Sequence, residues 1–276
     1  MKIALIQQFA GSDLQSNRQQ GLEAARQAAE AGANVICFAE LAFDPFYPQC
    51  PASNETLSKA EPVPGETTEM FCELAKENGV VIALNLFERD GDSTFDSSPV
   101  IDADGTILGV TRMIHITEYE CFHEQGYYAP GDHDAPVFDT AFGKIGIAIC
   151  YDRHFPEYMR HLANQGAELV IVPQAGAVDE WPDGLFEAEM QVAAFQNGFF
   201  TALCNRVGEE PQLSFAGESF VCDPAGRVVA RAGKGVEETL MCEIDLDETK
   251  TSHARKLFMR DRRPELYQAW FGNEAK

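Results

Sequence analysis

The chain has 276 residues, of which 45% are hydrophobic and 24% charged, a composition typical of a folded globular protein. Its net charge is −23, from 44 acidic and 21 basic residues, which argues against nucleic acid and membrane surfaces as partners. There is no signal-peptide pattern, no apolar run long enough to span a membrane and no paired spacing among the 8 cysteines, so we expect a reduced, cytoplasmic protein.

The hydrophobic pattern predicts buried strands that alternate with helices along the whole chain. Strands are expected at residues 2–8, 34–41, 80–87, 99–116 (a hairpin around Asp104-Gly105), 134–150 (a pair), 169–175, 199–205, 217–233 (a hairpin) and 239–246. Helices are expected at residues 13–31, 66–78, 156–168 and 184–197. This order predicts one layered α/β domain over residues 1–276, with mixed sheets under helices. The polar stretch 247–276 is expected to be a tail that packs on a partner subunit.

Cys150 ends the apolar run KIGIAIC, immediately before a predicted helix start at Pro156. The carboxyl end of a strand is where α/β folds place their ligands, and nearby backbone N–H groups can face an oxyanion there. A base and the positive end of a helix can activate a thiol in this position. The competing interpretation is a small buried core residue, which is the usual role of a cysteine inside a strand.

Glu40 ends the apolar run NVICFAEL in the same way. A carboxylate that directly follows apolar residues is rarely buried without a reason, so Glu40 is a candidate base. The alternative, equally weighted on spacing alone, is a solvated carboxylate at the end of a strand.

Several motifs spread over nearly the whole chain resemble one known family. They are the first strand with Gln7, FAEL at 38–41, PGE at 64–66, the R-x-x-H segment at 112–115, PGD at 130–132, GKIGIAICYDRHFPE at 143–157 and NRVG at 205–208. The chain resembles the nitrilase, or carbon–nitrogen hydrolase, superfamily. This resemblance implies a four-layer αββα sandwich with mixed sheets, one hydrolase domain, and a homodimer or higher homo-oligomer.

The resemblance also implies roles for individual residues. Glu40 would be the general base and Cys150 the nucleophile, with Glu124 as the second, supporting glutamate. The Tyr151 backbone N–H would help to form the oxyanion hole. The sequence departs from the family at Met113, which stands where the catalytic lysine of an R-K-x-H segment is expected. Loss of one such electrostatic donor typically costs ~10²–10³ in turnover.

Three interpretations of Met113 remain open. Another cation, such as Arg112 or Arg153, fills the role of the lysine; the substrate needs less stabilisation of its oxyanion; or the protein is a weak or inactive family member. Lys144 is not a candidate, because it belongs to the turn at the far end of the strand that leads to Cys150.

The segment CYDRHFPE resembles enzymes that act on N-carbamoyl amino acids, of the β-ureidopropionase type. In that group the arginine three residues after the cysteine, here Arg153, binds the substrate carboxylate, a role that suits a guanidinium. A surface salt bridge with Asp152 or Glu157 is the alternative. Glu189 is expected to line the pocket or to support the packing, and His115 and His154 are expected to be structural. No spacing indicates a metal site or another cofactor.

We therefore expect thiol-dependent hydrolysis of a C–N bond in a small-molecule linear amide or ureido compound. An N-carbamoyl amino acid is the leading candidate. The alternatives are an aliphatic amidase, or an inactive member that acts as a binding or regulatory protein because Met113 replaces the lysine.

Overall fold

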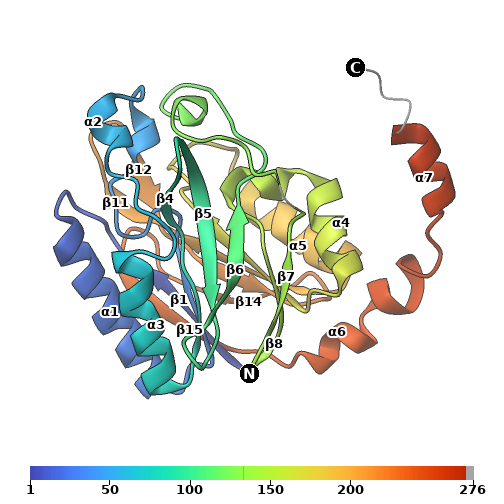
Figure 1. Ribbon diagram of the computed structural model, residues 1–276. Coiled ribbons are helices and arrows are strands. Elements are labelled where there is room, and N and C mark those ends of the chain that lie inside the picture. Colours follow the sequence, from blue (N-terminus) through green and yellow to red (C-terminus); the bar gives the residue numbers. More distant parts are fainter. Residues whose placement is uncertain (133, 272–276) are drawn as a thin grey trace.

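The computed structural model describes residues 1–132 and 134–271, which fold into two face-to-face sheets covered by helices (Figure 1). The first sheet has the order β15-β1-β2-β3-β5-β4, with β6 paired to β5. The strands are β15 (Glu238–Glu243), β1 (Lys2–Gln7), β2 (Val35–Phe38), β3 (Val81–Ala83), β5 (Ser93–Ile101), β4 (Leu86–Asp90) and β6 (Ile107–Arg112). Strands β1, β2 and β3 are parallel and the other pairings are antiparallel, so the sheet is mixed.

The second sheet is also mixed and has the order β14-β13-β10-β9-β8-β7. Its strands are β14 (Val228–Arg231), β13 (Phe220–Cys222), β10 (Phe200–Asn205), β9 (Leu169–Gln174), β8 (Gly143–Ile147) and β7 (Val137–Thr140). Strands β8, β9 and β10 run parallel to one another. A small separate hairpin is formed by β11 (Val207–Glu209) and β12 (Ser214–Ala216), which the sequence pattern did not predict.

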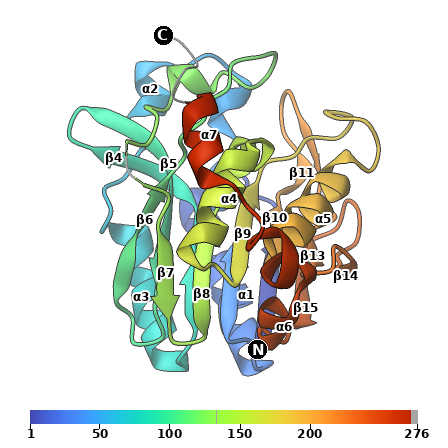
Figure 2. The same ribbon diagram turned by 90° about the vertical axis from the view of Figure 1, so that its right-hand side faces the viewer.

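Two pairs of helices form the outer layers, which Figures 1 and 2 show on opposite sides of the sheets. The pair on the first sheet is α1 (Leu14–Glu30) and α3 (Glu66–Asn78), and the pair on the second sheet is α4 (Pro156–Gln165) and α5 (Leu185–Asn197). Local signals set their ends: Asp13 caps α1 by accepting from two backbone N–H groups, and Gly79 ends α3 in the left-handed region. The predicted αββα sandwich with mixed sheets is confirmed.

The remaining helices are short. They are α2 (Asn54–Leu57), α6 (Asp247–Thr251), α7 (Pro264–Phe271), the 3₁₀ turns Tyr47–Gln49, Glu124–Gly126 and Cys150–His154, and the π-helical turn Ala254–Phe258. In the described part of the chain no helix combines the length and apolarity needed to cross a membrane.

Alternation along the strands divides the core into three apolar layers. In β1, Ile3 and Leu5 pack between the two sheets, whereas Ala4 and Ile6 pack under the helices of the first sheet. In β9, Leu169 and Ile171 face the first sheet, whereas Val170 and Val172 pack under α4 and α5. Because both faces of each central strand are buried, these strands appear in the sequence as continuous apolar runs.

Two strand predictions are corrected. Residues 80–87 do not form one strand, because the chain leaves the sheet at Leu84-Asn85, between β3 and β4. There the Asn85 amide accepts from the Leu41 backbone and donates to Asp96, so a buried polar side chain marks the break. The strand that leads to Cys150 ends at Ile147, and Cys150 begins a 3₁₀ turn instead of ending the strand.

The C-terminal segment leaves the sandwich through α6, and α7 stands off the α4–α5 layer (Figure 1). Trp270 on α7 is 58% exposed. Residues 272–276 of the expected tail lie outside the described residues. The packing of this tail on a partner subunit stays a prediction, which sedimentation of the full chain would test.

Candidate active site

Cys150 lies in a sharp turn where β8 passes into the second helix layer. It is the first residue of the 3₁₀ turn Cys150–His154, with φ at +40°, a left-handed conformation that is strained for a non-glycine residue. The turn is fixed from both sides: the Asp152 N–H donates to Ile149 O at 2.8 Å, and the Tyr158 hydroxyl donates to Ile147 O at 2.9 Å. The thiol is therefore held at the carboxyl edge of the second sheet, and the residue is 5% exposed.

The side chains of Gln174 and Arg153 both contact Cys150. The Gln174 amide Nε2, at the end of β9, lies 3.1 Å from Cys150 Sγ. Arg153 Nη1 donates to Cys150 O and to Gln174 Oε1, both at 2.9 Å. Sequence reasoning missed Gln174, although it lies near the end of the strand predicted at 169–175, a position like the one that singled out Cys150.

Arg153 is a buried residue, which makes the expected surface salt bridge with Asp152 or Glu157 wrong. Only 1% of its side chain is exposed, and its Nε lies 3.4 Å from Glu189 Oε2. Glu189 also accepts from His154 Nδ1 at 2.6 Å, and these neighbours, after a penalty from burial, lower its pKa. His154 and His115, whose Nδ1 lies 2.7 Å from Asp152 Oδ1, are in structural hydrogen bonds as expected.

Glu40 follows β2 on the facing sheet and is 0% exposed, so the alternative of a solvated strand end is wrong. The backbone around it is clamped by a second buried arginine: Arg206 Nη1 donates to Glu40 O and Nη2 to Asp44 O, both at 2.9 Å. The Leu41 N–H donates to Asn85 Oδ1 at 2.7 Å. These long-range contacts leave no trace in local sequence spacing, so Arg206 and Asn85 were not predicted.

Three buried carboxyl groups gather near Cys150. Burial, and then the charge of Glu124, raise the pKa of Glu40 to about 8, and the nearby Cys150 and Asp96 side chains oppose that rise. Burial, and then Asp96, raise the pKa of Glu124, whose Oε2 accepts from the Thr117 N–H at 3.3 Å. Burial and the charge of Glu40 also raise the pKa of Asp96. Asp96 was not predicted, because its strand has a polar sequence with no chemical signature.

Hydrogen bonds satisfy these carboxyl groups only in part. Within the described residues, both oxygens of Glu40, Asp96 Oδ2 and Glu124 Oε1 are buried without a hydrogen-bond partner. Buried carboxylates without partners favour the protonated form, because desolvation penalises the charge.

Met113 is 0% exposed and packs in the apolar layer that also contains Cys150. Its backbone N–H donates to Asp96 O at 2.9 Å, and its side chain is a thioether, which carries no charge. Arg112 is not a substitute, since Glu88 and Asp90 bind its guanidinium at 2.6 and 2.8 Å. Lys144 is paired with Asp139 on the surface, as its position in the sequence implied.

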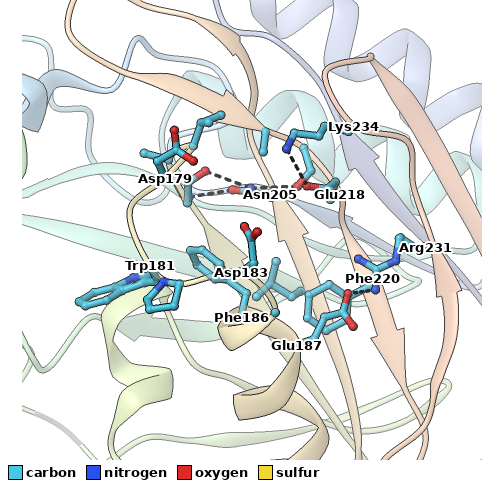
Figure 3. Close-up of a pocket in the computed structure, with 18 residues that line it drawn as sticks. Asp179, Trp181, Asp183, Phe186, Glu187, Asn205, Glu218, Phe220, Arg231 and Lys234 are labelled. Carbon is cyan, nitrogen blue, oxygen red and sulfur yellow. Dashed lines mark hydrogen bonds and ion pairs between the residues drawn. The ribbon is translucent and has the colours of Figure 1, made fainter.

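A cavity of about 280 Å³ opens beside this site, between the β9–α5 segment and the loops of the second sheet (Figure 3). Its wall includes Gly176 and Ala177, which follow Gln174 closely, and Trp181, whose ring lies 5.4 Å from that of His154. Cys150 is not among its lining residues. The cavity is thus lined by residues that follow Gln174 in the chain, and Gln174 contacts the thiol.

The charges of this cavity are mostly acidic. Arg231 is bound by Glu187, and Lys234 lies 4.0 Å from Glu218. Asp183 projects between these pairs into the cavity (Figure 3) and makes no hydrogen bond or ion pair within residues 1–132 and 134–271. No group of three or more His, Cys, Asp or Glu side chains in those residues could hold a metal ion.

The chain is similar to known proteins of one family. The family described as carbon-nitrogen hydrolase matches residues 2–254. The N-carbamoylputrescine amidase of Solanum lycopersicum is 36% identical over 96% of this chain and 93% of its own length. The crystal structure of a carbon-nitrogen hydrolase from Helicobacter pylori G27 has a TM-score of 0.91 and 28% identity, covering 100% of this chain and 99% of its own.

A further solved structure carries a ligand on its cysteine. It is a mutant of the amidase from Nesterenkonia sp. AN1 in which glutamine replaces a glutamate, with the acetamide moiety of fluoroacetamide added covalently at the active site cysteine. It has a TM-score of 0.81 and 26% identity, and covers 98% of this chain and 96% of its own. The amidases among these relatives hydrolyse amide-type C–N bonds, and the Nesterenkonia enzyme has an active site cysteine. From the match over residues 2–254 and these likenesses, the chain belongs to the carbon–nitrogen hydrolase family.

Proposed function

We propose that this chain hydrolyses the C–N bond of an N-carbamoyl compound, with Cys150 as the nucleophile and Glu40 as the general base. The observation that carries the proposal is the meeting of the two sheet edges. The edge of the second sheet presents the Cys150 thiol in a strained turn, and that of the first presents the fully buried Glu40 close enough for the two side chains to affect each other's pKa.

The chemistry follows from these two groups. Glu40 takes the thiol proton while Cys150 Sγ forms a bond to the carbamoyl carbon, and Glu40 then passes that proton to the leaving nitrogen as the C–N bond breaks. A water molecule, deprotonated by a carboxylate, attacks the thioester-like intermediate and restores the thiol. Glu124 supports Glu40 in this proposal, and the Tyr151 backbone N–H stabilises the oxyanion.

For the rest of the substrate, the adjoining cavity favours an amine tail. Asp183 is an unpaired carboxylate, whereas the two basic residues of the cavity wall face acidic partners. An ammonium group would complement Asp183, and the curated relative from tomato is named for a carbamoylated amine. A carbamoylated diamine such as N-carbamoylputrescine is therefore our first candidate for the substrate.

An N-carbamoyl amino acid is the second candidate, and one observation favours it. Arg153 Nη2 is buried without a hydrogen-bond partner in the described residues, so it has a free donor for a carboxylate close to Cys150. Against it, Glu189 already lies 3.4 Å from the same guanidinium. A simple aliphatic amide is the third candidate, on the strength of the Nesterenkonia amidase.

The test is ammonia release from N-carbamoylputrescine, N-carbamoyl-β-alanine and acetamide. We expect Asp183→Asn to raise KM several-fold for the amine-tailed substrate and to leave KM for acetamide unchanged, because a single charge–charge contact is lost. The matched control is Asp92→Asn, which removes one exposed carboxylate at the tip of the β4–β5 hairpin. Equal KM values for Asp183→Asn and Asp92→Asn would contradict the amine-tail assignment, and preferential use of N-carbamoyl-β-alanine would favour the Arg153 alternative.

A further inference from the structure

Gln174 places a buried amide against the thiol of Cys150. The residue is 1% exposed, and its Nε2 lies 3.1 Å from Cys150 Sγ. Its Oε1 accepts from Arg153 Nη1 at 2.9 Å, and the same nitrogen donates to Cys150 O at 2.9 Å. These contacts form a closed ring. The Gln174 amide contacts the Cys150 sulfur with one end and Arg153 with the other, and Arg153 contacts the Cys150 backbone.

Arg153 determines which end of the amide faces the sulfur. A guanidinium has donors and no acceptor, so the amide atom beside Nη1 must be the oxygen. The amide nitrogen therefore faces Cys150, where its N–H can donate to sulfur. In the opposite orientation two sets of N–H groups would face each other, and the amide oxygen would face the lone pairs of the sulfur.

Arg153 is itself held rigidly, and its charge is balanced. Its guanidinium lies 4.8 Å from the centre of the Phe186 ring and 3.4 Å from Glu189 Oε2. Arg153 touches no sulfur, since the two bonds of its Nη1 go to a backbone oxygen and to the Gln174 amide. It is therefore a positioning residue, which acts through Gln174.

The surroundings of Cys150 oppose ionisation of the thiol. Burial, and then the charges of Glu40 and Glu124, raise the pKa of Cys150, whereas the charge of Arg153 lowers it. A donor in direct contact with the sulfur offsets part of this effect, because hydrogen bonds to the charged form favour that form.

We infer that Gln174 is a catalytic residue, which donates its Nε2–H to the Cys150 sulfur and stabilises the thiolate, in a site where Met113 supplies no cation. The inference rests on the proposed function, in which Cys150 is the nucleophile. In the attack step the S–H proton goes to the Glu40 carboxylate, the S–C bond forms, and the electron pair of the C=O π bond moves to the carbonyl oxygen, which becomes the oxyanion. The amide proton stays on Gln174 throughout.

The experiment measures alkylation of Cys150 by iodoacetamide in the full chain across pH, followed by mass spectrometry of the peptide that contains residue 150. Gln174→Glu keeps an oxygen for Arg153 but replaces the donor with a second oxygen. Gln174→Met keeps the length and removes both polar ends. We expect either variant to slow alkylation at pH 8 about 10- to 100-fold and to move the rate–pH curve to higher pH, since a hydrogen bond to a charged group is lost.

Two controls isolate the contact. Gln125→Glu adds the same charge at an exposed position next to Glu124 and should leave the Cys150 curve unchanged. Cys50, an exposed thiol in the same chain, should react at one rate in every variant. Wild-type alkylation of Cys150 in Gln174→Met would overturn the inference, and this uncharged variant decides the question if Gln174→Glu does not fold.

Arg153→Lys tests the positioning role, because it keeps the charge but loses the planar fork that orients the amide. We expect a smaller shift of the alkylation curve in the same direction, and a wild-type curve would overturn the role of Arg153.

The outcomes separate this inference from the proposed function, because alkylation needs no substrate turnover. If the wild-type chain releases no ammonia and Gln174→Met still slows the alkylation of Cys150, the proposed function is contradicted, and with it the catalytic role of Gln174, whereas the stabilising contact of Gln174 with the sulfur is supported. If Gln174→Met releases ammonia at the wild-type rate, the proposed function is supported and the catalytic role of Gln174 is contradicted.

Discussion

The part of the candidate site on the second sheet and the part on the first sheet differ in how their polar groups and charges are balanced. On the second sheet, hydrogen bonds join Cys150 to Gln174 and Arg153, and the Arg153 guanidinium supplies a nearby positive charge. On the first sheet, Glu40 and Asp96 are buried with unpaired oxygens, and Met113 adds only a thioether. Met113, which stands where the family resemblance predicts a lysine, therefore lies on the carboxyl side of the site.

The two sides therefore depend on different contacts. The position of Cys150, the proposed nucleophile, depends on the turn after β8 and on Gln174 of β9. The protonation of Glu40, the proposed base, depends on the charges around it, because a buried carboxyl group without a counter-cation holds its proton to higher pH.

The largest effect is expected for Glu40→Gln, which should change how the free energy of unfolding depends on pH. The pKa of Glu40 is about 8 in the folded protein against its ordinary 4.5, so the folded chain retains a proton that the unfolded chain releases between these values. The stability that this carboxyl contributes is fully present below pH 4.5 and is lost as the pH rises through 8. Relative to wild type, Glu40→Gln should gain roughly 1.4 kcal/mol per pH unit in this window.

Chemical denaturation at several pH values measures that slope. The control is Glu69→Gln, which removes one exposed carboxyl group on α3 and against which the slope for Glu40→Gln is compared. A flat difference for Glu40→Gln would mean that Glu40 ionises normally, and the contrast between the two sides of the site would disappear.

Met113→Lys should have a smaller effect, on activity. A nearby ammonium favours the ionised carboxylate, so the pKa of Glu40 should fall and the acid limb of the rate–pH profile should move to lower pH. At pH 7 a carboxyl group with a pKa of about 8 is largely protonated, so full ionisation would raise the rate up to ~10-fold. Met113→Leu, which brings no charge, should leave the acid limb in place. A slower Met113→Lys enzyme would show instead that the site depends on the thioether.

The sequence predicted the fold and the two central residues because both leave local signals. Apolar runs with caps and glycine stops predict most strands and helices, and Cys150 and Glu40 each follow such a run. The partners of these residues come from distant parts of the chain: Gln174 reaches Cys150 across 24 positions, and Arg206 reaches Glu40 across 166. Spacing carries no information about such contacts, because the first arises when β8 and β9 pair within one sheet and the second when the two sheets pack together.

The break at Asn85 and the burial of Arg153 escaped prediction for the same reason. VVIALNLF appears as one apolar strand, yet the Asn85 amide finds partners on two other segments and ends the pairing. The sequence offered Asp152 or Glu157 as the acidic partner of Arg153, and only the fold shows that Glu189, on α5, lies beside it.

The most direct test of the central claim is ammonia release from N-carbamoylputrescine by the wild-type chain and by Cys150→Ala. We expect release by the wild type and a loss of at least ~10³-fold in Cys150→Ala, with thermal unfolding unchanged, because removal of a nucleophile eliminates the covalent route. Wild-type turnover in Cys150→Ala would contradict the assignment of Cys150 as the nucleophile.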